Sequence, residues 1–352
     1  TKSTGGTAMK ALQLPSVGRV VLVDLPVPAI KDDELLIRTG ATTICTSDLN
    51  DVRENPFNIA FPVVMGHEAA GIVAVVGANV TGFQVGDRVA AHPVHPCGRC
   101  PACQRSWGHL CVNVEHFAIN RQGTFAEYFP VRADRARMIP QSVPFTAAAL
   151  AEPVSVCLEA LAQAALPAGG TLLILGDGPF GILMARLAAS LPLRKTVLAG
   201  WEDFRLGFAQ SAVTINTKAM PNPVERLRTE AEELGYDAVI LAVGSPDAVR
   251  QGIALLRPKG RFVVFSALPG ETPIDLFRVH MDELEIVGAC SDENRLDDAI
   301  AQLSDPTLNL RELVTHTFPL EHYAEALTLA ETGHDRALKV AFVFDVDVPG
   351  GG

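Results

Sequence analysis

The sequence has no excess of basic residues. Its 352 residues include 29 Lys and Arg against 40 Asp and Glu, which gives a formal net charge of −11. Proteins that bind nucleic acid usually carry a basic surface, so this balance argues against a nucleic-acid partner. No uninterrupted apolar stretch approaches the ~20 residues of a membrane-spanning helix, and no membrane partner is predicted.

The N-terminal segment Thr1–Thr7 lacks the apolar core of a secretory signal peptide. The chain has seven cysteines, and four of them are clustered. In a secreted domain such cysteines would indicate disulfides. Without a signal peptide, and with short spacings, they are more typical of reduced metal-binding thiols, which predicts a cytoplasmic protein.

The length of the chain and its hydrophobic fraction of 48% predict two domains rather than one. Up to about residue 150, short alternating runs bounded by Pro, Gly or charged residues indicate a β-rich part. From about Pro153 the pattern changes to alternating helices and buried strands, which is typical of a doubly wound parallel sheet. After about Ser291 the sequence predicts two further helices and two strands. The predicted strands are Val20–Leu25, Glu34–Thr39, Gly71–Gly77, Val85–Ala90, Thr171–Leu175, Thr196–Ala199, Asp237–Val243, Arg261–Ser266, Leu313–Phe318 and Lys339–Phe344.

A cysteine-rich loop is the most informative local feature. Cys97, Cys100, Cys103 and Cys111 follow the pattern C-x2-C-x2-C-x7-C. Four thiolates at such short spacing are suited to surround one zinc ion tetrahedrally in a closed structural site.

A second set of metal ligands precedes and follows this loop. Cys45, His67, Glu68 and Glu152 supply a thiolate, an imidazole and two carboxylates. A catalytic zinc needs three protein ligands and one open position. Each residue alone has an ordinary structural interpretation, but the combination with the cysteine loop favours a catalytic zinc. Asp48 is a candidate for orienting the His67 ring.

A glycine-rich loop, Gly176-x-Gly178-Pro179-Phe180-Gly181, lies between a predicted strand and a predicted helix. In that context the glycines allow a tight turn and close approach of a dinucleotide pyrophosphate. The end of the next strand distinguishes NAD from NADP. Gly200 leaves room for a 2′-phosphate and Arg205 could contact it, whereas Glu202 would repel it. The sequence leaves the choice open.

Taken together, these motifs resemble the medium-chain dehydrogenase/reductase family, in its zinc-containing alcohol and polyol dehydrogenase branch. The resemblance covers residues 9–344, and the motifs occur in family order. They are Cys45–Asp48, Gly66–Gly71, Val85–Val89, the cysteine loop, Gly123–Tyr128, Glu152-Pro153, Gly176–Gly181 and Lys339-Val340.

The resemblance implies an α/β protein with a GroES-like β-rich catalytic domain and a Rossmann cofactor domain. The expected division is 1–153 for the catalytic domain, with the structural zinc loop at 97–111. Residues 154–292 form the cofactor domain, and 293–352 return to the catalytic domain. The active site is expected in the cleft between the domains, and a homodimer or homotetramer is expected.

The resemblance also assigns roles. Cys45 and His67 become ligands of the catalytic zinc, and the third ligand is Glu68 or Glu152, which exchange during turnover. Ser47 passes on the proton of the substrate, and the four loop cysteines hold the structural zinc. Two zinc ions per chain are therefore predicted. Zinc lowers the pKa of a bound alcohol, so that hydride can pass from carbon to the nicotinamide.

Several positions depart from the family pattern. Asn50 stands where the proton relay often has a histidine, and Asp51 where an aromatic residue often follows. Ser291-Asp292 replaces the Arg-Tyr pair of sorbitol-type members, which argues against sorbitol itself as substrate. Outside the predicted sites, Cys157 and Cys290 are expected to be buried core thiols.

The leading hypothesis is therefore a zinc-dependent, NAD(P)-linked dehydrogenase of a secondary alcohol, polyol or sugar-derived alcohol. The same enzyme could act mainly as a reductase of a ketone or aldehyde. The direction depends on the equilibrium of the reaction and on the cofactor pool, and the sequence shows neither. The alternative is a non-catalytic sensor or structural protein that binds zinc and nucleotide. Intact Cys45, Ser47, His67 and Glu152 argue against it.

Overall fold

The computed structural model describes residues 8–346, except 232–233, 269 and 293. The chain forms two compact units. The first runs to Glu152 and resumes at Leu296, and the second comprises Pro153–Arg295. The division falls in the first turn of helix α4 (Ala151–Gln163).

The first unit is built on mainly antiparallel β-sheets. Its largest sheet has the strand order β10-β6-β5-β3-β18-β17, and β9 also pairs with β3. Its strands are β1 (Ala8–Ser16), β2 (Arg19–Pro26), β3 (Glu34–Thr43), β4 (Val63–Val64), β5 (Glu68–Val76), β6 (Arg88–Ala91), β7 (Val94–His95), β8 (Glu115–His116), β9 (Tyr128–Arg132), β10 (Ala136–Met138), β17 (Val314–Phe318) and β18 (Lys339–Val343). Its helices are α1 (Thr46–Arg53), α2 (Pro101–Gln104), α3 (Phe145–Ala148), α10 (Leu296–Ser304) and α11 (Tyr323–Thr332).

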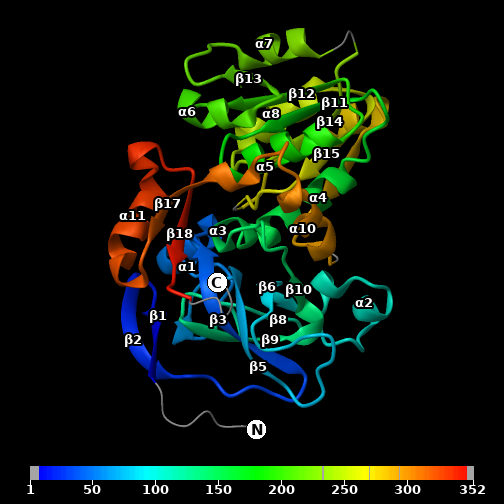
Figure 1. Ribbon diagram of the computed structural model, residues 1–352. Coiled ribbons are helices and arrows are strands. Elements are labelled where there is room, and N and C mark those ends of the chain that lie inside the picture. Colours follow the sequence, from blue (N-terminus) through cyan, green and yellow to red (C-terminus); the bar gives the residue numbers. More distant parts are fainter. Residues whose placement is uncertain (1–7, 232–233, 269, 293, 347–352) are drawn as a thin grey trace. The chain divides into compact units, whose positions relative to one another are not determined.

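The C-terminal part of the chain completes this unit. Strand β18 pairs antiparallel with β3 and parallel with β17, so the red end of the chain lies beside the blue start in Figure 1. Leu12, Phe125 and Phe342 meet in one apolar core. Burial of side chains that lie far apart in sequence therefore joins the two ends of the chain into one domain.

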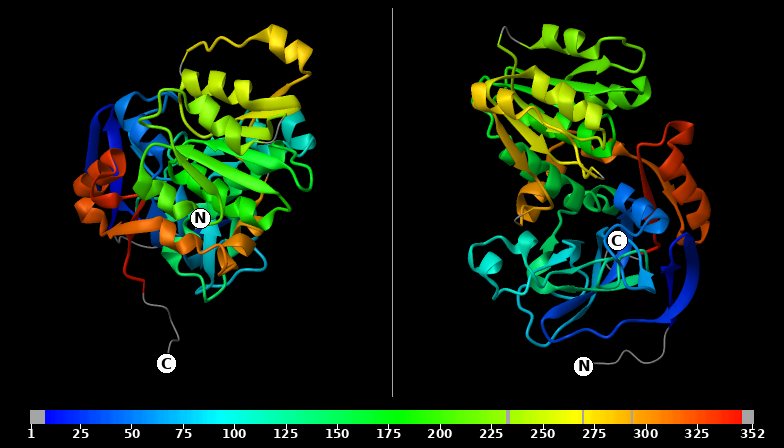
Figure 2. Two further views of the ribbon diagram at one scale, coloured as in Figure 1. Left: turned by 90° about the horizontal axis from the view of Figure 1, so that it is seen from above. Right: turned by 180° about the vertical axis from the view of Figure 1, so that it is seen from behind.

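The second unit is a Rossmann fold. Its six strands are all parallel, in the order β13-β12-β11-β14-β15-β16, and helices pack on both faces of the sheet (Figure 2). Strands buried on both faces need continuous apolar runs, as in Thr171–Leu175, where every residue is buried. The strands are β11 (Thr171–Leu175), β12 (Lys195–Gly200), β13 (Val213–Asn216), β14 (Tyr236–Leu241), β15 (Leu256–Val264) and β16 (Glu285–Gly288). The helices are α4, α5 (Pro179–Leu187), α6 (Asp203–Leu206), α7 (Pro223–Glu230), α8 (Pro246–Leu255) and α9 (Leu276–Met281).

The strand order reverses at β11, whose neighbours are β12 and β14. In doubly wound sheets a ligand binds at this point, beyond the carboxyl ends of the strands. The glycine-rich loop directly follows β11 and therefore lies at the predicted position for a dinucleotide.

Several strands of the fold were not among those expected from the sequence. Edge strand β13 was not predicted, because Val213 and Thr214 are exposed and the segment carries no continuous apolar run. By length and composition, one helical run of 19 residues, Phe145–Gln163, is apolar enough to cross a membrane, although Glu152 and Glu159 interrupt its apolar residues. This run is 78% buried inside the structure, as a core helix is.

Candidate active site

The register of the main sheet brings the predicted metal ligands to one place. Thr43 at the end of β3 pairs with Glu68 at the start of β5, and with Ala341 of β18 on its other side. Cys45 follows this end of β3, and His67 directly precedes β5. Residues from distant parts of the sequence therefore meet because their strands are neighbours.

Three of these residues form a compact set of ligand atoms. One atom each of Cys45, His67 and Glu68 lies within 4.8 Å of the others, and all three residues are buried. A thiolate, an imidazole and a carboxylate are the donors that zinc takes in proteins, so the residues fit the ion. Among the described residues, Glu152 does not belong to this set, although it is also buried, with 8% of its surface exposed.

Gly66 provides the backbone turn that positions His67 next to the other ligands. Its φ angle is +87°, and an added Cβ would lie 2.2 Å from the ring of Phe125. Both the left-handed backbone and the lack of space require glycine.

Asp48 holds two ligands at once. Its Oδ2 accepts the backbone N–H of Cys45 at 2.8 Å, and its Oδ1 accepts Nδ1–H of His67 at 3.2 Å. Nε2 of His67 is then left for a metal, and the prediction that Asp48 orients this ring is confirmed. Burial opposes the charge on His67, but Asp48 and Cys45 outweigh it and raise the pKa of His67 well above its ordinary value. Ser47 Oγ lies 3.5 Å from the same Nε2, beside the expected metal position.

Glu68 is held by a buried cation that the sequence analysis did not assign. Nζ of Lys339 lies 2.7 Å from the Glu68 carboxylate, and Thr43 Oγ1 donates to the same carboxylate. Lys339 is 3% exposed. Burial opposes its charge, but Glu68, Cys45 and Glu152 together raise its pKa. The closing Lys339-Val340 motif was the only signal in the sequence for this pair.

Asp51 is a second buried group to which the sequence analysis gave no role. It lies four residues after Ser47 on α1, and therefore on the same face of the helix. It is 6% exposed, and its Oδ1 has no hydrogen-bond partner among the described residues. Burial and the charge of Asp48 raise the pKa of Asp51 to about 7.

This raised pKa predicts a dependence of stability on pH. The unfolded state releases the Asp51 proton near pH 4, whereas the folded state keeps it up to about pH 7. Stability attributable to this group is therefore fully present below about pH 4 and is lost as the pH rises to about 7. Relative to wild type, Asp51→Asn should gain roughly 2–4 kcal/mol across this window.

The measurement is the difference in melting temperature between wild type and variant at pH 5 and pH 8. It is made at matched zinc content, because a nearby cation would lower the pKa. Asp24→Asn, at an exposed position on β2, is the control and should show no such window. An equal difference in melting temperature at both pH values would contradict the raised pKa of Asp51.

The four loop cysteines form the second ligand set. One sulfur of each residue lies within 4.8 Å of the others. Strands β7 and β8 pair at the base of the loop and bring its two ends together. Backbone N–H groups point at the sulfurs: those of Cys97 and Asn113 each donate to Cys111 Sγ at 3.3 Å. Backbone donors, first that of Cys103, lower the pKa of Cys100 to about 6, which favours the thiolate that binds metal.

All seven cysteines lie in the described part of the chain, and none of them forms a disulfide. Cys157 is buried, as expected, but the expectation for Cys290 was wrong, because it is exposed. Cys290 lies two residues after the short edge strand β16, whose residues are themselves exposed or only partly buried. His95 packs edge-on against Phe117, outside the ligand sets found among the described residues.

The glycine-rich loop has the geometry that a dinucleotide requires. Gly176 has φ +121°, and a Cβ on Gly181 would lie 1.9 Å from the carbonyl oxygen of Gly176. Gly178 is the N-cap of α5, with Pro179 at its first turn. Phe180 contacts Phe265 edge-on, with ring centroids 5.2 Å apart. The backbone therefore turns tightly from β11 into the N-terminus of α5, where phosphates bind.

The three candidates for cofactor choice lie at and after the end of β12. Gly200 ends this strand, Glu202 is the N-cap of α6, and Arg205 lies in α6. Glu202 pairs with Lys218 at 2.5 Å, and both side chains are about half exposed.

A buried Cys-His-carboxylate set in a β-rich unit, together with a Rossmann unit, defines a zinc-dependent oxidoreductase that uses a nicotinamide cofactor. The comparisons agree. Residues 31–141 match the alcohol dehydrogenase GroES-like domain, and residues 179–305 match the zinc-binding dehydrogenase domain. Sorbitol dehydrogenase of Bacillus subtilis (strain 168) is 32% identical over 340 residues, which cover 94% of this chain and 96% of the relative.

Two solved structures have the same fold. One, described as a zinc-binding dehydrogenase of Sinorhizobium meliloti 1021 bound to NADP, has a TM-score of 0.89 and 27% identity over 96% of this chain and all of its own. The other, an alcohol dehydrogenase of Escherichia coli CFT073 with NADH, has a TM-score of 0.90 and 26% identity over the same shares.

The chain therefore belongs to the medium-chain dehydrogenase/reductase family, in its zinc-containing alcohol and polyol dehydrogenase branch. It is an NAD(P)-linked oxidoreductase of alcohols, and the hypothesis of a non-catalytic sensor is not supported. The predicted fold class, a GroES-like domain with a Rossmann domain, is confirmed.

Proposed function

We propose that the enzyme interconverts a secondary alcohol, polyol or sugar-derived alcohol with the corresponding ketone at a zinc ion held by Cys45, His67 and a carboxylate. The observation that carries this proposal is the convergence of Cys45, His67 and Glu68 within 4.8 Å at one end of the sheet. When bound, zinc acts as a Lewis acid that lowers the pKa of the alcohol and orients it for hydride transfer.

The residues of the chain fix the geometry for this chemistry. Asp48 holds the Cys45 backbone and the His67 ring together, so that thiolate and imidazole face one point. Ser47 Oγ, 3.5 Å from the metal-facing nitrogen of His67, is placed to accept the substrate proton. Asn50 cannot continue the proton route as a base. In this proposal Asp51, one turn after Ser47 on α1 and buried with its Oδ1 unpaired among the described residues, continues the route.

The third ligand alternates between Glu68 and Glu152 in this proposal. Glu68 is already held by Lys339 and Thr43, which favours Glu152 as the ligand at rest. The charge of Lys339 is favoured most by Glu68, then by Cys45 and least by Glu152, so in this proposal it balances the negative charge of Glu68 while Glu152 is on the metal.

The substrate class rests on the relative that acts on sorbitol by its name. Because Ser291-Asp292 replaces the family's Arg-Tyr pair, we propose a polyol other than sorbitol, or a sugar-derived alcohol. We also propose a homodimer or homotetramer in the cytoplasm, on the family resemblance and the reduced thiols.

The test is metal analysis combined with a substrate panel. The purified protein should hold two zinc ions per chain and should reduce the nicotinamide with a polyol or secondary alcohol. Cys97→Ser should lose one zinc and keep the other. If wild type held a single zinc that Cys97→Ser removed, the catalytic site would be disproved.

A further inference from the structure

Asp177 is a buried carboxylate in the middle of the cofactor loop. It lies between Gly176 and Gly178, and only 9% of its surface is exposed. Its Oδ2 accepts two backbone N–H groups, that of Trp201 at 2.8 Å and that of Glu202 at 2.7 Å. Asp177 therefore ties the glycine-rich loop to the turn that follows strand β12.

This side chain also explains why residue 200 is glycine. A Cβ on Gly200 would lie 2.3 Å from Asp177 Cβ and 2.6 Å from its Oδ2. The carboxylate thus fills the space that a side chain at the end of β12 would need. Gly200 by itself had indicated room for a phosphate, but in the folded protein Asp177 occupies that room.

In Rossmann folds an acidic residue at the end of the second strand binds the ribose of NAD, whereas a small residue and a cation accept the phosphate of NADP. Strand β12 is the second strand of this unit. We infer that Asp177, which lies in the glycine-rich loop, acts in place of an acidic residue at the end of β12. It thereby makes the enzyme select NAD(H) over NADP(H). This inference rests on the nicotinamide-linked function of the Rossmann unit.

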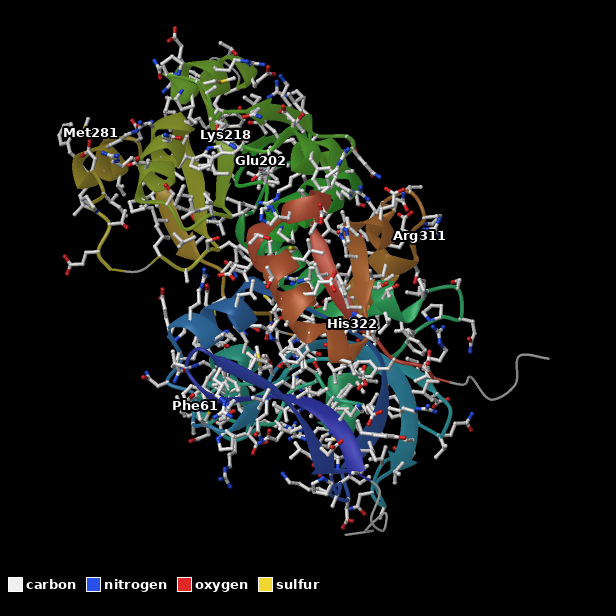
Figure 3. The ribbon with its side chains drawn as sticks, turned by 90° about the vertical axis from the view of Figure 1, so that its left-hand side faces the viewer. Phe61, Glu202, Lys218, Met281, Arg311 and His322 are labelled. Carbon is white, nitrogen blue, oxygen red and sulfur yellow. The ribbon has the colours of Figure 1, made fainter. Side chains whose placement is uncertain are left out.

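The charges around Asp177 support the same choice. The N–H groups of Trp201 and Glu202 would be the natural donors to a phosphate at this turn, but Asp177 already accepts both. Lys218 would be a natural cation, but it pairs with Glu202 at 2.5 Å. The two residues are labelled close together in Figure 3. Arg205, in helix α6, is the cation that the sequence analysis named for this phosphate. A phosphate would be repelled by Asp177 and would find these donors occupied.

The test is a pair of titrations of the whole, zinc-loaded protein with NADH and NADPH, following nicotinamide fluorescence. We expect wild type to bind NADH at least roughly tenfold more tightly, the discrimination that one charged hydrogen-bonding group provides. Asp177→Ser removes the charge and frees the two amides. Its ratio of dissociation constants, NADPH over NADH, should fall by roughly tenfold or more, with NADPH binding itself becoming tighter.

Glu283→Gln is the matched control, because it removes an exposed carboxylate of the same unit that is paired with Lys259 and lies outside the cofactor loop and the turn after β12. It should change the ratio by less than about threefold, as expected for an exposed, paired charge. A purely structural role of Asp177 would weaken both cofactors together instead of shifting their ratio. If Asp177→Ser does not fold, the isosteric Asp177→Asn is measured in its place, and the wild-type ratio remains a test by itself.

Equal binding of the two cofactors by wild type, or tighter binding of NADPH, would overturn the inference. So would an unchanged ratio in a folded Asp177 variant. These titrations need no alcohol, so a wild type that prefers NADH but turns over no alcohol would disprove the proposed catalytic site and support the role of Asp177. Binding of neither cofactor would overturn both.

Discussion

Replacing Cys45 with serine should lower kcat/KM for the alcohol by at least about a thousandfold, because a metal ion contributes several kcal/mol to such a transition state. The hydroxyl of serine is a far weaker zinc ligand than a thiolate. Cys45 is not in the Rossmann unit, so cofactor binding should be retained. Metal analysis should show one zinc per chain, since the four loop cysteines are separate from this site.

Cys290→Ser is the matched control, because Cys290 is an exposed thiol outside both ligand sets. It should keep both zinc ions and full activity. A Cys45→Ser protein that retained its second zinc and near-normal turnover would show that the Cys45-His67-Glu68 set is not the catalytic metal site. Loss of cofactor binding together with activity would point to misfolding instead, which circular dichroism would reveal.

Replacing Lys339 with methionine should destabilise the fold by about 3–5 kcal/mol, because it leaves the fully buried Glu68 carboxylate without its cation. Lys339 and Glu68 are 3% and 0% exposed, so water cannot take over the missing interaction. The same change should leave Glu68 free to stay on the metal and should therefore lower kcat. Thermal unfolding and steady-state kinetics measure the two effects separately.

The double variant Glu68→Gln/Lys339→Met removes both charges and should recover much of the lost stability, although not the activity. Arg53→Met is the control for loss of a surface ion pair, since Arg53 and Glu331 are about half exposed; it should cost less than about 1 kcal/mol. If Lys339→Met were no more destabilising than Arg53→Met, the buried pair would not stabilise the site.

Much of this protein could be predicted from local patterns. The cysteine spacing identified a ligand set that the structure gathers within 4.8 Å. The apolar run Thr171–Leu175 was predicted as a buried strand, and it is β11 with the same bounds. Both features are local: a short loop brings its own ligands together, and a strand covered on both faces needs apolar residues throughout.

The charged contacts of the active site could not be predicted from local sequence patterns. Lys339 and Glu68 are 271 positions apart, and only the pairing of β3 with β5 and β18 brings them to one end of the sheet. Asp51 gave no signal either, because the sequence shows a carboxyl group but not its burial. Its pKa is raised by the packing around α1 and by the nearby Asp48.

The sequence by itself determined the family, the four-cysteine ligand set and the position of the nucleotide loop, because these depend on residue type and short spacing. The tertiary structure decided which charged side chains are buried and which groups they contact. In the folded protein the Asp177 side chain fills the space beside Gly200, and Lys339 forms a buried ion pair with Glu68. Such effects depend on burial and on distances between chain segments, and both exist only after the strands have paired and the cores have packed.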